Sequence, residues 1–286
     1  MKFTNRWNLP PWVIAGFSVP RKPVPRRIGV TELIDSPLVR QIKVANWDEI
    51  TIDYSDLLAS ETGTWKHQSL EEAYNVQEGL LPELKLEVPF DDWTVVGKID
   101  LYVPSTGTII DHKFVKVGYA TMHKAQLTAQ LNCYAELMRH RGHKVNRLVG
   151  DIRYCKDWDW KMAAFGTPYP YPPIPYETVE VDLWSHEVAD EYIRGRLLSH
   201  SVEGKRCSPE ERWEGKPSFA VMSGRKPIAK RVCHTREEAL AWAAEKRVAD
   251  AWIQERPGGS LRCKLWKNGM SFCNGVREFC PYKDMD

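Results

Sequence analysis

The sequence predicts an α/β protein, and three features of the middle of the chain carry this prediction. Apolar and polar residues alternate over much of 84–114, which indicates β-strands because alternate side chains of a strand point to opposite faces. The segment 119–140 contains no proline or glycine and predicts one long helix. Two apolar segments, 148–154 and 178–181, predict further strands, and 183–199 predicts another helix. Strands and helices mixed in this way are typical of a sheet covered by helices.

The composition is that of a folded, non-membrane protein. Of the 286 residues, 43% are hydrophobic and 27% are charged, so the chain is neither a disordered tail nor a fibre. This length suits two compact units, or one core domain with a large insertion. The apolar runs are far shorter than the roughly 20 residues that a membrane helix needs, and no apolar leader follows the N-terminus. We therefore expect a cytoplasmic protein with no membrane contact.

Four segments are expected along the chain. Five prolines between positions 10 and 25 exclude a long helix or a central strand, so an irregular N-terminal segment is expected over 1–28. The strands and helices described above belong to a core over 29–206, in which 63–77 is a further helix. Residues 207–256 are expected to form a small α+β insert, and 257–286 a cysteine-rich C-terminal segment.

The insert carries its own secondary-structure signals. Two apolar segments, 219–222 and 229–233, predict a hairpin around the basic turn 223–227. Thr235 precedes a helical segment and Glu238 follows three residues later, which is the pattern of a capping box. The basic turn suits contact with DNA, and an ordinary solvated charged face explains it equally well.

Charge is segregated along the chain although the net charge is only +2. Residues 1–43 carry eight Lys and Arg against two acids, and 44–100 carry three against thirteen. Residues 201–286 carry seventeen against twelve. Two basic ends around an acidic middle suit a protein that holds a polyanion and also a cation. Ordinary scatter of surface charge is the alternative.

The strongest chemical signal is a pair of acidic strands joined by a turn. Asp100 ends the first strand segment, and Asp111 and Lys113 follow the turn at 104–107. Alternate residues of a strand share a face, and pairing of the two strands places Asp100 close to Asp111. Two adjacent carboxylates are unfavourable unless a cation binds them, and hard oxygen ligands suit Mg²⁺ or Mn²⁺. The lysine could orient water or neutralise charge on a phosphate. A surface hairpin with ordinary salt bridges is the alternative.

Four residues around this hairpin are further candidates. His67 lies on the predicted helix before the strands, and a histidine beside two carboxylates is a plausible third ligand that favours Mn²⁺. Glu87 lies in the preceding strand. Gln130 and Tyr134 are four residues apart on the following helix and therefore share a face. Each of these residues alone more often has a packing role than a functional one.

The order of these motifs resembles the RecB-type branch of the PD-(D/E)XK nuclease superfamily. The matching pieces are Gly63-Thr-Trp-Lys-His67, Gly97-Lys-Ile-Asp100, Ile110-Asp-His-Lys113 and Gln130-Leu-Asn-Cys-Tyr134. The segment Val30-Thr-Glu-Leu-Ile-Asp-Ser-Pro37 is similar to the one before the histidine helix in phage-type members. The resemblance covers most of 29–286. It implies a restriction-endonuclease-like core over 29–206, with a central mixed sheet flanked by helices.

The resemblance also implies roles for individual residues. The implied metal ligands are His67, Asp100, Asp111 and the backbone carbonyl of His112. Lys113 would be the catalytic lysine. Gln130 and Tyr134 would position the lysine, water or DNA, and Glu87 would support the site.

Four cysteines form a second candidate site. They are Cys207, Cys263, Cys273 and Cys280, separated by 55, nine and six residues. The odd total of seven cysteines argues against a disulfide framework. Four thiolates suit an iron–sulfur cluster or zinc, but a zinc ribbon prefers closely spaced pairs. The pattern resembles RecB-type nucleases such as AddB, phage exonucleases and the CRISPR-associated iron–sulfur nucleases, which implies a [4Fe–4S] cluster. Zinc and free thiols are the alternatives.

The sequence therefore predicts a metal-dependent DNA nuclease. The resemblance favours an exonuclease that acts on DNA ends, single-stranded or processed duplex, in phage-type recombination or replication. A recombination or replication protein is the expected partner besides DNA. A metal-dependent endonuclease or nickase is a close alternative, and a non-catalytic DNA-binding module with the same fold is a more distant one. No G-x-x-x-x-G-K-[ST] motif is present, so no helicase is expected within this chain.

Overall fold

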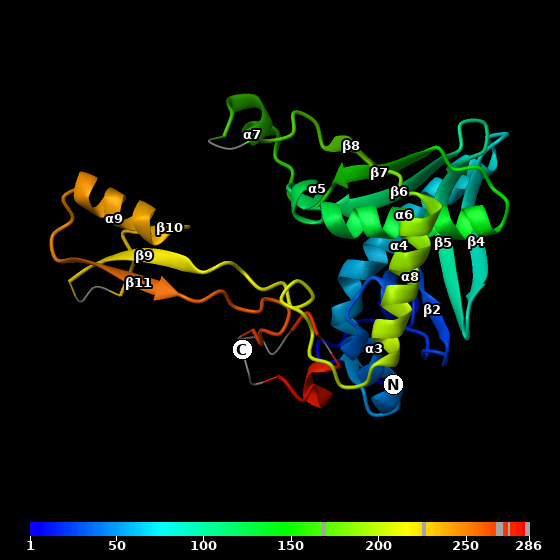
Figure 1. Cartoon of the computed structure of the whole chain (residues 1–286), viewed down its shortest axis with the longest axis horizontal. Coiled ribbons are helices and arrows are strands. Elements are labelled where there is room, and N and C mark those ends of the chain that lie inside the picture. The colour runs from blue at the N-terminus through cyan, green and yellow to red at the C-terminus, as the bar shows by residue number, and fades with distance from the viewer. Residues whose placement is uncertain (168–169, 225–226, 267–270, 274, 284–286) are drawn as a thin grey trace. The chain divides into compact units, whose positions relative to one another are not determined.

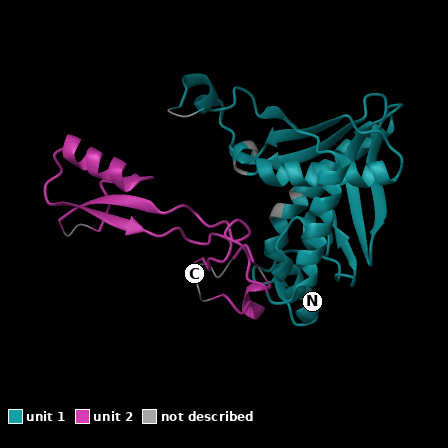
Figure 2. Cartoon of the chain, in the orientation of Figure 1, with its two compact units in different colours: residues 1–204 teal, residues 205–286 magenta. Residues whose placement is uncertain are grey.

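The computed structural model describes residues 1–167, 170–224, 227–266, 271–273 and 275–283. The chain forms two compact units, unit 1 over Met1–Gly204 and unit 2 over Lys205–Asp286 (Figure 2).

A mixed β-sheet forms the centre of unit 1 (Figure 1). Its strands are β2 (Arg27–Gly29), β4 (Leu81–Phe90), β5 (Trp93–Val103), β6 (Thr108–Val115), β7 (Arg147–Tyr154) and β8 (Tyr176–Val181). Their order is β2-β5-β6-β7-β8, and β4 pairs along most of β5. The pairs β2–β5 and β6–β7 are parallel, whereas β4–β5, β5–β6 and β7–β8 are antiparallel.

Helices cover both faces of this sheet. The helix α4 (Leu58–Asn75) contacts β4 and β6, and α6 (Lys124–His140) contacts β4, β5, β6 and β7. Asp111 of β6 is hydrogen-bonded to α6, whereas the next residue, His112, is hydrogen-bonded to α4. Successive side chains of a strand point to opposite faces, so the two helices lie on opposite sides of the sheet. The predicted mixed sheet flanked by helices is confirmed.

The main hydrophobic core lies between the sheet and α6. Ile99 of β5 and Ile109 of β6 are fully buried, as are Leu131 and Leu137 of α6. The other helical elements of unit 1 are α1 (Pro11–Ile14), α2 (Val30–Leu33), α3 (Pro37–Asn46), the 3₁₀ turn η1 (Tyr54–Leu57), α5 (Tyr119–Met122), α7 (Trp160–Phe165) and α8 (His186–Ser201). Since α6 is buried along most of its length, its side chains hold a fixed position against the sheet.

Two parts of unit 1 differ from the prediction. The single helix predicted over 119–140 is two helices, α5 and α6, which meet at His123 with a φ of −115°. The segment 1–28 is more regular than its prolines indicate, because β1 (Lys2–Thr4) pairs in parallel with β3 (Thr51–Asp53). That pairing joins residues about fifty positions apart, which no local pattern reveals.

Unit 2 contains a three-stranded antiparallel sheet with one helix. Its elements are β9 (Ser218–Ser223), β10 (Arg231–Cys233), α9 (Arg236–Glu245), β11 (Ala251–Arg256) and the 3₁₀ turn η2 (Arg277–Phe279). The predicted hairpin is formed by β9 and β10. Thr235 caps α9, and Glu238 completes the predicted capping box. Arg225 and Lys226 of the predicted basic turn lie outside the described residues.

The boundary between the units falls after Gly204, close to the predicted start of the insert. The insert and the cysteine-rich segment belong to the same unit, and a backbone bridge between Glu214 and Ser260 connects them. Beside this bridge the two backbones are very close, since a Cβ added at Gly258 would lie 1.5 Å from the carbonyl oxygen of Gly215. Only glycine fits there without a shift of the backbone.

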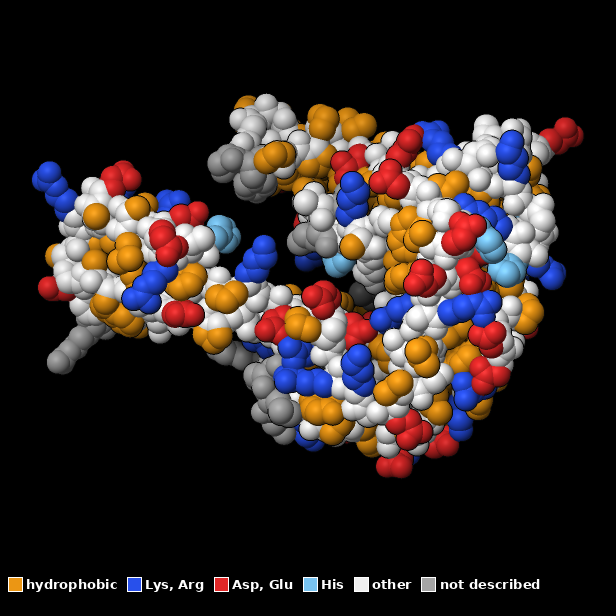
Figure 3. All heavy atoms as spheres, viewed as in Figure 1, with side chains coloured by type: hydrophobic (Ala, Val, Ile, Leu, Met, Phe, Trp, Pro, Cys, Tyr) orange, Lys and Arg blue, Asp and Glu red, His pale blue; other side chains and the backbone are white. Residues whose placement is uncertain are grey.

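The charge segregation along the sequence does not produce a surface of one sign on the face that Figure 3 shows. Lys and Arg side chains lie beside Asp and Glu side chains over the visible face of unit 1 (Figure 3). In the described part of the chain, none of the helices combines the length and the hydrophobicity that crossing a bilayer requires.

Candidate active site

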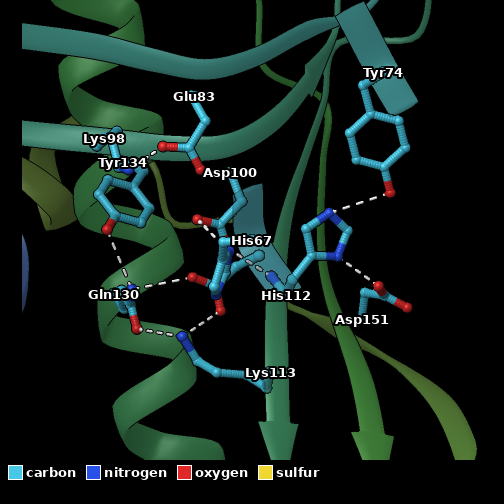
Figure 4. A network of polar contacts seen from close by, with 11 residues as sticks. His67, Tyr74, Glu83, Lys98, Asp100, His112, Lys113, Gln130, Tyr134 and Asp151 are labelled. Carbon is cyan, nitrogen blue, oxygen red and sulfur yellow. Dashed lines mark hydrogen bonds and ion pairs between the residues drawn. The ribbon is translucent and has the colours of Figure 1, made fainter. Parts of the chain in front are cut away.

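The site is built where β5 and β6 separate. The two strands pair from Val103 opposite Thr108 to Leu101 opposite Ile110, so Asp100 and Asp111 are the next residues on each strand. Oδ2 of Asp100 accepts a hydrogen bond from the backbone N–H of His112 at 2.8 Å. The ammonium of Lys113 lies 2.5 Å from Oδ2 of Asp111. The structure thus brings the two aspartates and the lysine of the predicted constellation together, and Figure 4 shows Asp100 and Lys113 within the same network.

The helix α6 adds two of the predicted residues. Nε2 of Gln130 donates to Oδ1 of Asp111 at 3.0 Å and to the hydroxyl of Tyr134 at 3.2 Å (Figure 4). Oε1 of Gln130 accepts from Nζ of Lys113 at 3.1 Å. A Cβ added at Gly97 of β5 would lie 3.0 Å from the ring of Tyr134, so the glycine lets α6 approach the sheet. The amide of Gln130 therefore holds the acid and the lysine at once.

A histidine and two carboxylates form a group that fits a divalent cation. Nδ1 of His67 lies 3.5 Å from Oδ1 of Asp100. One ligand atom from each of His67, Glu83 and Asp100 lies within 4.8 Å of the others. Two oxygen ligands and one imidazole nitrogen suit Mn²⁺ or Mg²⁺. In the structure Glu83 forms an ion pair with Lys98.

Glu83, and not the predicted Glu87, lies beside His67 and Asp100. The structure does not bring Glu87 into this group, because its carboxylate is exposed and is bound by the guanidinium of Arg27, with one N–O distance of 2.9 Å. The neighbouring pairs of the β4–β5 ladder are Pro82 with Leu101 and Leu84 with Ile99, which puts Glu83 opposite Asp100. Glu83 also has a φ of 50° in the left-handed region, and such conformations are frequent at functional sites.

His112 has contacts that the sequence does not reveal. Its side chain points to the α4 face, where Nδ1 lies 2.5 Å from Oδ2 of Asp151 and Nε2 lies 3.3 Å from the hydroxyl of Tyr74 (Figure 4). Both His112 and Asp151 are buried. The pair fixes the backbone between Asp111 and Lys113 from the opposite side of the sheet. The register between β6 and β7 puts His112 opposite Asp151, and only knowledge of this register would have predicted the pair.

Burial and mutual repulsion shape the charges of the site. Burial, and then the negative charge of Asp111, raise the pKa of Asp100 to about 7. Burial lowers the pKa of His67, and the neighbouring His112 adds to this. Burial opposes the charge of Lys113, but the adjacent Asp111 outweighs it and raises the pKa of the lysine. Within the described structure, Oδ2 of Asp111 is buried and accepts no well-directed hydrogen bond. Lys113 pairs with Asp111 and Lys98 pairs with Glu83, whereas the raised pKa of Asp100 shows that negative charge on this residue is disfavoured, and a bound cation would relieve this.

A second group of possible metal ligands lies at the other end of α6. Ligand atoms of Glu136, His140 and His186 lie within 4.8 Å of one another. Glu136 is completely buried, and Nδ1 of His186 lies 2.6 Å from its Oε1. Its other oxygen accepts from Arg139, which also donates to the carbonyl of Trp184 at 2.8 Å. This network ties α6 to the segment before α8 and has a structural explanation.

The four candidate cluster cysteines all lie in unit 2. Burial raises the pKa of the Cys273 thiol, Arg262 lowers it, and the thiols of Cys207 and Cys280 raise it, so these three thiols are neighbours. Nε of Arg277 donates to the carbonyl of Cys263 at 3.0 Å. No three cysteine sulfurs of the described residues lie within 4.8 Å of one another, whereas zinc–sulfur bonds of about 2.3 Å place sulfurs closer than this.

Comparisons with known proteins show only distant structural likenesses. The sequence matches no protein-family model and no curated protein. One solved structure with some likeness is the protein SSO0001, with a TM-score of 0.46 and 13% identity over 68% of this chain and 82% of that chain. Another is a phage-related exonuclease from Haemophilus somnus 129PT, with a TM-score of 0.38 and 15% identity over 61% of this chain and 91% of that chain. At these TM-scores neither likeness establishes a shared fold.

Proposed function

We propose that this chain is a metal-dependent nuclease that hydrolyses phosphodiester bonds of DNA. One observation carries the proposal: Lys113 lies 2.5 Å from the buried carboxylate of Asp111, and beside them the partly buried Asp100, whose pKa is raised to about 7, lies with Glu83 and the imidazole of His67. Buried carboxylates without sufficient positive charge are costly in a protein that has no use for a cation. A DNA phosphate bound together with a divalent cation would place positive charge beside the carboxylates and negative charge beside Lys113.

The residues that would hold Mg²⁺ or Mn²⁺ are His67, Glu83, Asp100 and Asp111, with the backbone carbonyl of His112 as a further candidate. When bound, such a cation supplies Lewis-acid stabilisation of phosphate charge and a lower pKa for an attacking water. The chain itself keeps these ligands in place, since the N–H of His112 holds Asp100 and the amide of Gln130 holds Asp111.

Lys113 is the group of the chain that neutralises charge on the substrate. Its ammonium has three donors, of which Asp111 and Gln130 engage two. In this proposal the ammonium also binds a phosphate oxygen or orients water. Preorganised positive charge in a water-poor site stabilises the negative charge that develops during hydrolysis. Tyr134 acts on the lysine indirectly, because its hydroxyl accepts from the same amide that binds Lys113.

Within this class we propose an exonuclease that acts on DNA ends in phage-type recombination or replication, as the sequence resemblance implies. End-labelled linear and closed circular single-stranded DNA, incubated with Mn²⁺, Mg²⁺ or EDTA, test the proposal. Linear DNA should be degraded and the circle spared, and EDTA should stop the reaction. Cutting of the circle would assign an endonuclease instead. Binding without cleavage under every condition would favour a non-catalytic DNA-binding module.

A matched pair of variants links this activity to the site. Asp111→Asn removes a buried carboxylate of the site and should abolish cleavage. Asp92→Asn removes an exposed carboxylate that pairs with Arg26 and should leave cleavage unchanged. Equal activity of the two variants would contradict the site assignment.

We also propose that Cys207, Cys263, Cys273 and Cys280 hold an iron–sulfur cluster, with zinc as the alternative. The position of all four cysteines in one unit and the electrostatic influence of the Cys207 and Cys280 thiols on Cys273 support a shared site. Four thiolates are the usual ligand set of a [4Fe–4S] cluster. Iron, sulfide and zinc analysis of anaerobically purified protein decides between the two groups, and Cys280→Ala should lower the iron content.

A further inference from the structure

An open pocket of about 440 Å³ lies beside the candidate active site in unit 1. It is lined by residues of α4, β6 and β7, among them Trp65, Lys66, Phe114 and Arg153. Its volume is at the lower end of the range that small-molecule sites occupy. The pocket is therefore large enough for a small planar group and has no part in the ligand set described above.

The pocket is connected to the site through one aromatic contact. The ring of His67 meets the ring of Phe114 edge to face, with the centroids 5.3 Å apart. Phe114 directly follows Lys113 on β6. His67 thus contacts Asp100 on one side and the wall of the pocket on the other. Lys113 and Phe114 are successive residues of the strand and point to opposite faces of the sheet, so the pocket adjoins the site through His67 and Asp100 and not through the lysine.

The pocket combines an exposed aromatic with two cations. Trp65 of α4 is 54% exposed. Nζ of Lys66 lies 5.1 Å from the centroid of the Phe114 ring, and Cζ of Arg153 lies 5.7 Å from it. Since both cations lie over the Phe114 ring, this ring serves to hold them, and the indole of Trp65 is the aromatic surface left for a ligand.

The two cations differ in how strongly they are already engaged. Arg153 is anchored by Asp151, with an N–O distance of 3.1 Å. Lys66 forms no ion pair with any residue that the structure describes, so its charge is available to an anion. A stacking surface next to available positive charge is the arrangement that proteins use to bind single-stranded nucleic acid.

We propose that this pocket binds one unpaired nucleobase of the DNA strand, stacked on Trp65, with Lys66 on the adjacent phosphate. The proposal rests on the proposed nuclease function and specifies its substrate as single-stranded at the site of cleavage. A base inside a duplex is stacked and paired on both sides, so it cannot enter the pocket without first leaving the helix.

The test measures binding of fluorescent oligonucleotides in EDTA, where metal-dependent cleavage cannot occur. Trp65→Ala should weaken binding of single-stranded DNA roughly 5- to 150-fold, the range expected for loss of one base–aromatic stack. Trp65→Phe should retain most of the affinity. Trp12→Ala, which removes a tryptophan of α1 that is 78% exposed, should bind like the wild type and serves as the matched control.

A single abasic position moved along the oligonucleotide identifies the base that enters the pocket. At one position the abasic site should weaken binding to the wild type, and the same change should have no further effect on Trp65→Ala. Lys66→Ala should instead reduce the dependence of log affinity on log salt by about 0.7, the value for one phosphate contact with a single strand. This effect of Lys66→Ala on the salt dependence should be the same wherever the abasic site lies in the oligonucleotide.

The outcomes separate this proposal from the proposed function. If Trp65→Ala binds like Trp12→Ala, or the abasic scan is flat, the pocket does not bind a base, and the nuclease assignment stands on its own cleavage assay. If Trp65→Ala loses binding and the wild type cleaves nothing, the base pocket stands and the nuclease function fails. Equal affinity of the wild type for duplex and single-stranded DNA would also overturn the pocket.

Discussion

The carboxylate of Asp100 on β5 accepts the backbone N–H of His112 on β6 at 2.8 Å, just beyond the last ladder pair of the two strands. The backbone pairing of β5 and β6 ends at Leu101 and Ile110, and this hydrogen bond from a backbone N–H to a side chain continues the connection between the strands. It also links Asp100 to a residue whose own side chain is fixed by Asp151 on the other face of the sheet. The acidic site is therefore held in place from both faces.

Replacement of His112 tests this support. His112→Ala removes the partner at 2.5 Å from the buried carboxylate of Asp151, which keeps its ion pair with Arg153, so the free energy of unfolding should fall by about 2 kcal/mol. Tyr74→Phe removes only the longer 3.3 Å contact and should lower it by less than about 1 kcal/mol. Urea denaturation measures both values. Equal effects of the two variants would show that Asp151 does not depend on the histidine.

Glu83 and Glu87 give a matched pair for metal binding. Glu83 lies with His67 and Asp100, whereas Glu87 is exposed and bound by Arg27. Glu83→Gln should weaken Mn²⁺ binding by at least about 10-fold, because it removes a charged ligand. Glu87→Gln should leave Mn²⁺ affinity unchanged. Titration calorimetry with Mn²⁺ distinguishes them, and a larger loss in Glu87→Gln would restore the assignment made from the sequence.

The pKa of Asp100 predicts how stability of the metal-free protein depends on pH. The folded pKa is about 7, and an unfolded aspartate has a pKa near 3.9. Between these values the folded chain binds more protons than the unfolded chain, so stability falls as pH rises from about 4 to 7, by at most about 1.4 kcal/mol per pH unit. Asp100→Asn removes this titration. In EDTA the variant should therefore gain stability relative to the wild type from pH 4 to 7, and a pH-independent difference would contradict the account.

The buried network at Glu136 is expected to matter for stability. Glu136 is completely buried between His140, His186 and Arg139, and Glu136→Ala leaves Arg139 without its carboxylate. Loss of one partner of a buried ion pair costs about 3 kcal/mol or more. Glu187→Ala, on the adjacent exposed turn of α8, should change stability by less than about 0.5 kcal/mol. Thermal unfolding of the two variants should differ clearly, and similar midpoints would show that the network carries little stability.

The sequence predicts those parts of the site that depend on local periodicity. Asp111 and Lys113 share a face because a strand alternates, and Gln130 and Tyr134 share a face because a helix repeats every 3.6 residues. The strands and helices of the mixed sheet follow from the same two periods. The break at His123 is not predicted, because no proline or glycine marks it.

The contacts that the sequence misses depend on register between distant strands. Glu83 lies opposite Asp100 only because of how β4 aligns with β5, and its left-handed backbone has no signature in the residue type. His112 and Asp151 lie 39 positions apart and meet only through the β6–β7 ladder. Glu87 is close to Glu83 in sequence, yet its carboxylate binds Arg27 on the surface. Local patterns do not determine such registers.

The central claim is that Lys113 acts on DNA together with the acidic site, and one comparison tests it most directly. Lys113→Ala and Lys116→Ala remove lysines three residues apart, of which only the first contacts Asp111 and Gln130. Cleavage of end-labelled single-stranded DNA with Mn²⁺ should be slower by at least about 100-fold in Lys113→Ala, the usual effect of losing one preorganised donor. Lys116→Ala should cleave like the wild type. Cleavage by Lys113→Ala at the wild-type rate would contradict the account.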